Sequence, residues 1–193
     1  MIDKVPLRKH LRAKRDALPA EFVASASDRV RERVLGLPEV NSADTLLVYC
    51  SAGSEVETYT LIEDLLARGQ SVAVPVITGA GLMAGYAIHS LRELAPGAFG
   101  ILAPRAELCT ENRRCDSPGV VLLPGVGFDP ETGHRIGTGG GYYDRFLTNH
   151  PAVKTVGLAF DEQLAERLPA EPHDVPVSVM VTPTRVIRPQ SGR

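Results

Sequence analysis

A dense run of glycines makes residues 135–146 of this 193-residue sequence its strongest candidate for ligand binding. The run reads RIGTGGGYYDRF and includes Gly137, Gly139, Gly140 and Gly141. Each glycine weakens an ordered segment by roughly 0.5–1 kcal/mol relative to alanine, out of a net stability of about 5–15 kcal/mol. Such a segment is either a disordered hinge or a place where backbone approaches a ligand closely. Because it follows an apolar strand and precedes a helix, we favour the ligand, and successive N–H groups before a helix predict an anion.

Charged residues in and near this run suit a nucleoside triphosphate. Arg135 opens the run and offers a charge-assisted contact to phosphate. Neither GxxxxGK[ST] nor GxGxxG is present, so the common nucleotide motifs do not apply. A triphosphate usually arrives with Mg²⁺, which prefers carboxylate oxygens, and Asp144 and Asp174 are the candidates. By composition alone, a helix-cap or turn role is the more frequent use of either aspartate.

Two further polar elements are candidates for ligand contacts. Lys4 and Arg8 are four residues apart, so on a helix both could face one anion, although most such pairs belong to a solvated helix face. Glu55 and Glu57 lie in the loop SAGSEVET after a predicted strand, where α/β sheets bind ligands. Either glutamate could instead favour the dipole of the helix that follows.

The N-terminal part must position these residues on helices and on a βαβ unit. Apolar residues repeat at helical spacing up to Pro38, and another helix face carries Arg8, Arg12 and Arg15. The elements predicted next are a strand over 45–51, a helix over 59–68 and a strand over 71–77. Strand, helix and strand in this order predict a parallel pair with a right-handed crossover.

The C-terminal part continues the alternation. The apolar run Val120–Pro124 is typical of a central strand covered on both faces. The other predictions are a strand over 82–88, a loop over 96–104, a polar surface segment over 105–118, a helix from Tyr142, a strand over 155–160, a short helix over 162–168 and a strand over 177–182. The alternation predicts an α/β fold: a single layered domain over residues 1–193, with a mostly parallel central sheet flanked by helices.

Composition excludes several classes of protein. A content of 44% hydrophobic and 23% charged residues argues against a disordered chain. With a net charge of −2, the chain lacks the positive charge that binding to a nucleic-acid backbone needs. No run approaches the roughly 18 apolar residues of a membrane span, and no apolar core of a signal peptide follows the basic start. The three cysteines predict reduced thiols. We expect a cytoplasmic monomer that binds no nucleic acid and no membrane.

Five blocks in order carry a resemblance to a known family. They are LPGVGFD, RIGTGGGYYDRFL, VGLAF, HDVPV and VMVT. The four-residue spacing of Lys4 and Arg8 and the segment Glu55–Thr58 add to the resemblance. From about Lys4 to Thr182, the chain resembles the 5-formyltetrahydrofolate cyclo-ligases, also called 5,10-methenyltetrahydrofolate synthetases.

The resemblance implies an ATP- and Mg²⁺-dependent ligase that closes a C–N ring. Phosphoryl transfer from ATP to the formyl oxygen of 5-formyltetrahydrofolate creates a leaving group, and attack by N10 then gives 5,10-methenyltetrahydrofolate, ADP and phosphate. This chemistry asks the protein for positioning and electrostatic stabilisation rather than for a nucleophile. Two alternatives stay open: a nucleotide- or folate-binding protein without turnover, and a small-molecule kinase on a similar scaffold.

The resemblance also implies roles for individual residues. ATP is expected to contact Lys4, Arg8, Arg135, Ile136, Gly137, Thr138, Gly139, Gly140, Gly141, Tyr142 and Tyr143. Folate is expected to contact Cys50, Glu55, Thr138, Gly139, Gly140, Gly141 and Tyr142. Asp144 and Asp174 are expected to hold Mg²⁺, and the catalytic candidates are Arg135, Tyr142 and Tyr143. The chain departs from the family pattern at Val76, Phe99, Ala103 and Ser178.

Overall fold

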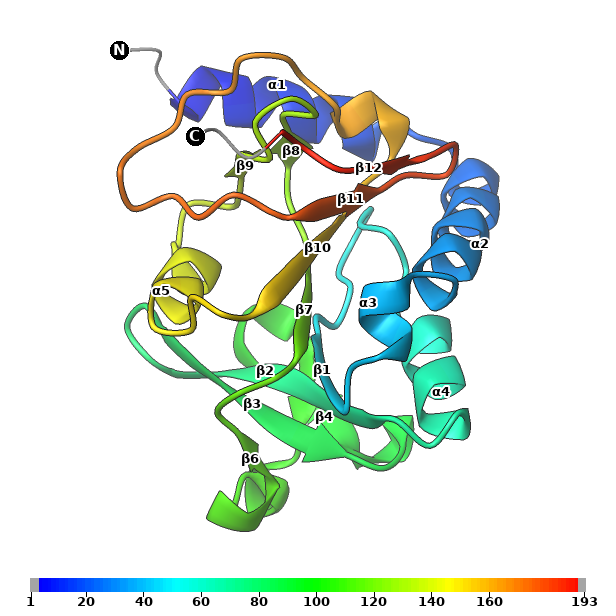
Figure 1. The fold of residues 1–193 in the computed structure, drawn as a ribbon, viewed down its shortest axis with the longest axis vertical. Coiled ribbons are helices and arrows are strands. Elements are labelled where there is room, and N and C mark those ends of the chain that lie inside the picture. The colour runs from blue at the N-terminus through cyan, green and yellow to red at the C-terminus, as the bar shows by residue number, and fades with distance from the viewer. Residues whose placement is uncertain (1–3, 191–193) are drawn as a thin grey trace.

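The computed structural model describes residues 4–190, and its centre is an eight-stranded sheet (Figure 1). The strands are β1 Thr45–Val48, β2 Ser71–Gly79, β3 Leu82–Ile88, β6 Arg114–Cys115, β7 Val120–Leu123, β10 Lys154–Leu158, β11 Val179–Val181 and β12 Val186–Ile187. Their order across the sheet is β12-β11-β10-β7-β1-β2-β3-β6. The five strands from β11 to β2 are parallel, and the antiparallel strands β12, β3 and β6 extend the two edges.

Helices cover both faces of this sheet. They are α1 Lys4–Asp16, α2 Ala20–Leu35, α3 Pro38–Asn41, α4 Tyr59–Ala67 and α5 Tyr142–Thr148. Side chains alternate along a strand, so Leu46 and Val48 of β1 pack with α2 and α4, whereas Leu47 packs with α5 on the other face. Figure 1 shows the same division, with α2, α3 and α4 on one side and α5 on the other. The α/β fold expected from the sequence is confirmed, and β7 is the predicted central strand, buried along its whole length.

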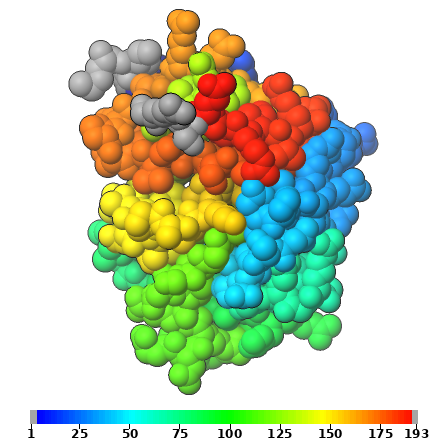
Figure 2. Space-filling model, in the orientation of Figure 1, coloured from blue at the N-terminus to red at the C-terminus, as the bar shows by residue number. Residues whose placement is uncertain are grey.

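The two ends of the described chain meet on one face. Figure 2 shows the last strands, in red, lying against the blue helices. The Arg33 guanidinium donates to the carbonyl oxygen of Thr184 at 3.3 Å, and Arg188 forms an ion pair with Glu39 at 2.5 Å. Among residues 4–190, no helix is long and apolar enough to cross a bilayer.

Two sequence predictions for local structure are wrong. The predicted loop over 96–104 is part of a small hairpin, β4 Leu94–Pro96 with β5 Leu102–Pro104. The segment 105–118 lies at the surface as predicted, and it also contains edge strand β6. No helix spans 162–168, because after a single 3-10 turn at Asp161–Gln163 the chain bridges to Phe128 at Leu164 and takes a left-handed conformation at Arg167 (φ 57°).

Candidate functional site

A cavity of about 210 Å³ opens where β1 and β7 end. Both strands are parallel and adjacent, so their carboxyl ends reach the same edge of the sheet. Tyr49 and Cys50, which come directly after β1, line this cavity together with Pro124 and Gly125, which come directly after β7. The chain passes from β1 to β2 on one side and later adds β7 on the other, so the cavity lies at the point where the strand order reverses. Open α/β sheets bind ligands at such a point.

One wall of the cavity is apolar. It comes from β2, β3 and the β4–β5 hairpin, and its side chains include Pro75, Ile77, Met83, Phe99, Ile101 and Leu102. Phe99, at the tip of the hairpin, is 82% exposed and has a left-handed backbone (φ 58°). Ala103 also lines this wall, so two of the four departures from the family pattern, Phe99 and Ala103, fall on the cavity.

The other two departures lie elsewhere. Ser178 belongs to the sheet rather than to the cavity wall, since its hydroxyl donates to the Thr155 carbonyl oxygen at 2.7 Å. Val76 lies on β2, opposite Ala84 of β3.

Cys50 and Glu55, which the resemblance assigns to folate contacts, both line the cavity. Burial raises the pKa of the Cys50 thiol to about 12, so it stays a neutral thiol near pH 7 and offers no thiolate nucleophile. Glu55 accepts a hydrogen bond from the Ala52 amide at 3.1 Å, and its side chain is 15% exposed. Burial raises the pKa of Glu55, and the Ala52 amide and the nearby Arg15 and Arg12 partly oppose that rise.

The glycine run crosses the cavity on its way from β9 (Arg135–Ile136) to α5. Gly137, Thr138, Gly141, Tyr142 and Tyr143 line it. The neighbouring Gly139 and Gly140 face a second cavity of about 330 Å³, whose other lining residues are Gly141, Asp144, Arg145, Thr148 and His173. Ile136 lines neither cavity, because its side chain is 2% exposed and packs against the Leu11 cluster. Gly139 (φ 107°) and Gly141 (φ 64°) adopt left-handed conformations that other residues rarely tolerate.

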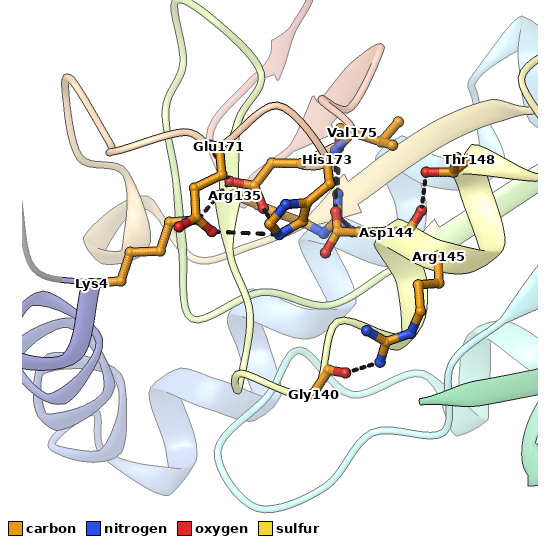
Figure 3. Close-up of polar contacts among 10 residues, drawn as sticks. Lys4, Arg135, Gly140, Asp144, Arg145, Thr148, Glu171, His173 and Val175 are labelled. Atoms are coloured by element: carbon orange, nitrogen blue, oxygen red, sulfur yellow. Dashed lines mark hydrogen bonds and ion pairs between the residues drawn. The ribbon is translucent and has the colours of Figure 1, made fainter. Parts of the chain in front are cut away.

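Arg135 is buried beneath the glycine run rather than free at its entrance. Its guanidinium donates to the Val175 carbonyl oxygen at 2.6 Å and to Asp144 Oδ1 at 2.8 Å (Figure 3). The Val175 amide donates to the same Asp144 oxygen at 3.2 Å. Asp144 therefore lies next to the 174–175 backbone, which brings the two predicted magnesium ligands onto neighbouring segments.

Lys4 and Arg8 contact different segments, although both lie on α1. Arg8 Nε donates to the Gly137 carbonyl oxygen at 2.8 Å, so Arg8 lies against the glycine run. Lys4 Nζ instead pairs with Asp174 at 2.6 Å and Glu171 at 2.9 Å. Lys4 and Arg8 therefore share no hydrogen-bond or ion-pair partner in the described structure.

The segment around Asp174 gathers several groups that can bind a metal. Glu171, His173 and Asp174 offer ligand atoms that lie within 4.8 Å of one another. Burial acts to raise the pKa of Asp174, but hydrogen bonds from Lys4 and the Glu171 amide outweigh it, and the net pKa is lowered. Sequence reasoning named only Asp174 here, although the block EPHD already placed the other two within three residues.

A family model described as the 5-formyltetrahydrofolate cyclo-ligase family matches residues 1–183. The chain belongs to the 5-formyltetrahydrofolate cyclo-ligase family. It is 36% identical over 182 residues to the 5-formyltetrahydrofolate cyclo-ligase of Escherichia coli (strain K12), covering 91% of this chain and 98% of that one. The mouse (Mus musculus) enzyme of the same name is 29% identical over 181 residues, covering 89% of each chain.

A solved structure supports the same assignment. The chain resembles the 5,10-methenyltetrahydrofolate synthetase of Aquifex aeolicus with a TM-score of 0.84 and 35% identity, covering 98% of this chain and 94% of that one. Membership of the cyclo-ligase family confirms the resemblance, the enzyme class and the folate reaction expected from the sequence, and the matched structure confirms the α/β fold.

Two arginines of this cyclo-ligase site were missed from the sequence. Arg145 on α5 donates to the Gly140 carbonyl oxygen (Figure 3). It also donates to the Gly81 carbonyl oxygen at 2.7 Å, so it links the β2–β3 turn to the glycine run. Arg15 shares a predicted helix face with Arg8 and Arg12, but it is 6% exposed and lies behind Glu55. Nothing in the sequence near Arg15 indicates burial, because its partners lie 39 and 110 residues away.

Proposed function

We propose that this chain closes the ring of 5-formyltetrahydrofolate at the cavity beyond β1 and β7, with ATP as co-substrate and Mg²⁺ as cofactor. The observation that carries the proposal is the shared cavity: Glu55 from the loop after β1 and the glycine run before α5 line the same space. A folate bound against the apolar wall would therefore lie beside a backbone suited to phosphate.

The reaction has two chemical steps. The formyl oxygen attacks the γ-phosphorus of ATP, the bond from that phosphorus to ADP breaks, and ADP leaves. The N10 lone pair then attacks the formyl carbon, N10 loses its proton, and the bond from carbon to the phosphorylated oxygen breaks to release phosphate. The product is the 5,10-methenyl cation. No side chain needs to form a covalent bond, which agrees with a neutral Cys50.

The ATP side of the proposal rests on Arg8, Arg135 and the glycine run. The Arg8 guanidinium donates to a neutral carbonyl oxygen, so this contact leaves its charge available to a phosphate. Arg135 lines the cavity beside Asp144, where it can stabilise charge that develops on the transferred phosphoryl group. Burial raises the pKa of Tyr143, so its hydroxyl stays a neutral donor next to the same space.

The donor set fits magnesium. Asp144 and Asp174 supply carboxylate oxygens from segments joined by the Val175 amide, and Mg²⁺ prefers hard oxygen ligands. Both carboxylates are paired with cations in this structure, Asp144 with Arg135 and Asp174 with Lys4. When bound, Mg²⁺ would neutralise charge on the triphosphate. We expect Asp144 and Asp174 to hold it and Lys4 to remain near the phosphates.

A product assay tests the proposal. Purified protein with ATP, Mg²⁺ and 5-formyltetrahydrofolate should generate the near-ultraviolet absorbance of the methenyl product, and omission of ATP should abolish it. A folded protein that gives no absorbance contradicts the proposal. Folate binding without ADP release would favour a binding protein, and γ-phosphate found on another acceptor would favour a kinase.

We further propose that the protein acts in the cytoplasm as a single-domain monomer. The continuous sheet supports one domain, since its strands come from the range 45–187. The three cysteines are free thiols, which agrees with a reducing compartment. Sedimentation tests the monomer, and cell fractionation tests the location.

A further inference from the structure

We propose that Arg15 is a positioning residue that fixes Glu55 as a carboxylate anion at the folate wall of the cavity. The inference rests on the proposed function, because it takes the folate to be the ligand that Glu55 meets. It adds a residue to the site that neither the motifs nor the cavity lining contain, since Arg15 lies behind the lining residues.

The contacts of Arg15 join two walls of the cavity. Its Nε donates to Ser54 Oγ at 3.0 Å, in the loop after β1. Its Nη1 donates to the Gly125 carbonyl oxygen at 3.4 Å, in the segment after β7. The same Nη1 lies 3.7 Å from Glu55 Oε1. One planar guanidinium therefore holds Ser54, Glu55 and Gly125 in a fixed relation, which suits the fork geometry of arginine.

The charges around Arg15 single out Glu55 as its buried counter-ion. The side chain of Arg15 is 7% exposed and that of Glu55 is 15% exposed. Asp16 also lies 3.8 Å from Arg15, but its side chain is 53% exposed, so water screens that pair. A buried cation without its counter-ion destabilises the protein, and so does a buried carboxylate without its cation.

Other titratable groups face Glu55 from every neighbouring element. The groups that interact with it electrostatically are Arg12 and Arg15 on α1, Tyr49 after β1, Tyr59 on α4, and Tyr143 on α5. Cys50 lines the same cavity, and Glu57 lies two residues further along the loop. Burial raises the pKa of Tyr49, Cys50, Tyr59 and Tyr143, so these four stay neutral near pH 7. The cations that oppose the effect of burial on Glu55 are Arg15 and the more exposed Arg12.

Removal of the Arg15 charge should therefore let Glu55 take up a proton at higher pH than in the wild type. A protonated carboxyl loses part of its capacity to accept hydrogen bonds from the N–H groups of a folate. The sign follows from this: the variant binds folate worst at the acid end of the assay range and recovers as the pH rises and Glu55 ionises.

The test compares KM values for 5-formyltetrahydrofolate and for ATP between about pH 6 and pH 8 in Arg15→Gln and in the wild type. In Arg15→Gln, the ratio of folate KM to the wild-type value should be larger at the acid end than at the alkaline end, by at most about tenfold for each pKa unit that Glu55 gains. The ATP KM should stay near that of the wild type. Arg12→Gln, a loss of the same charge one turn earlier on α1, should show a smaller effect of the same sign.

A second pair of variants separates positioning from folding. Glu55→Gln should raise the folate KM without any added pH dependence, and Arg15→Gln in that background should add none. Arg15→Lys keeps the charge but loses the fork, so it should raise the folate KM severalfold at every pH and leave the ATP KM unchanged. This variant carries the test if Arg15→Gln does not fold.

Three results would overturn the role of Arg15. The first is a pH-independent loss of turnover in a less stable Arg15→Gln protein, which would assign Arg15 to structure alone. The second is an equal rise of the folate and ATP KM values in Arg15→Lys. The third is a pH-dependent effect of Arg15→Gln that persists in the Glu55→Gln background. A wild-type protein without turnover would contradict the proposed function instead, so the two failures are distinguishable.

Discussion

The proposed folate side and the proposed phosphate side of this site differ in how their charged groups are paired. On the folate side the walls are mostly apolar, and the Arg15 guanidinium lies 3.7 Å from the Glu55 carboxylate. On the phosphate side, several charged groups form ion pairs with one another. Arg135 binds Asp144, and Lys4 binds both Asp174 and Glu171.

This difference indicates two modes of ligand binding. On the folate side, the loop after β1 is held by hydrogen bonds within it. The Tyr49 hydroxyl donates to the Val56 carbonyl oxygen at 2.9 Å, and the Thr58 hydroxyl donates to the Tyr49 carbonyl oxygen at 2.7 Å. On the phosphate side, the proposed triphosphate and metal would have to exchange partners with existing ion pairs. Changes on the phosphate side should therefore alter turnover and the ATP requirement, whereas changes on the folate side should alter folate affinity.

Asp144→Asn should have the largest effect, because it removes one expected metal ligand and leaves Arg135 without its counter-ion. We expect turnover to fall about 100-fold at saturating ATP, the scale for loss of one preorganised electrostatic group. The product absorbance measures turnover, and circular dichroism checks the fold. Asp64→Asn, which breaks the Arg31–Asp64 pair between α2 and α4, is the matched control and should keep its turnover. Near-normal turnover in Asp144→Asn would remove that residue from the site.

Lys4→Ala should raise the KM for ATP about tenfold, equivalent to roughly 1.4 kcal/mol, and leave the folate KM unchanged. The reason is that Lys4 pairs with Asp174 on the phosphate side, at the opposite end of α1 from Arg15. Initial rates over an ATP series measure the change. Lys9→Ala removes an exposed lysine of the same helix and should have no effect. An unchanged ATP response in Lys4→Ala would break the distinction between the two sides.

Gly141→Ala should lower turnover severalfold and reduce stability. A left-handed alanine costs roughly 1–2 kcal/mol, and the new methyl group would lie 2.9 Å from Arg145 Nη1. Gly69→Ala introduces the same kind of strain (φ 78°) after α4, with no atom within 4 Å of the added Cβ. Urea unfolding should show both losses of stability, whereas the rate assay should show a defect for Gly141→Ala alone. Equal rates in the two variants would contradict a role for the glycine run in ATP binding.

Local sequence patterns predicted the elements whose burial is uniform. Val120–Leu123 reads as a continuous apolar run because both faces of β7 are covered, and the parallel pairing of β1 with β2 followed from the helix between them. The glycine run was recognisable because close approach of backbone requires residues that few other positions need. The central strand, the parallel pair and the glycine run can all be recognised from residues close together in the sequence.

The parts that could not be predicted depend on distant partners. The β4–β5 hairpin has strands of only three residues, each ending in proline, and two glycines in its loop, so its local pattern predicts a loop. Only the fold brings β5 against the distant strand β2. Arg15 has the spacing of an open helix face, and only the fold brings Ser54, Glu55 and Gly125 to it. The pairing of Lys4 with Asp174 across 170 residues has the same origin.

Cys50→Ala should have the smallest effect on turnover, less than about twofold, because Cys50 lines the folate side of the cavity as a neutral thiol.

The effect of Cys50→Ala on stability should depend on pH. Burial raises the thiol pKa from near 9 to about 12, so the folded protein retains a proton that the unfolded chain releases. The wild type should therefore lose stability relative to Cys50→Ala as the pH rises above about 9, by at most about 1.4 kcal/mol per pH unit. Urea unfolding between about pH 8 and pH 10 measures this difference, and Cys109→Ala, which removes a half-buried thiol, should show a shallower one. A difference between wild type and Cys50→Ala that stays constant with pH would mean that the folate wall admits water around Cys50, and the contrast with the phosphate side would then rest on Glu55 alone.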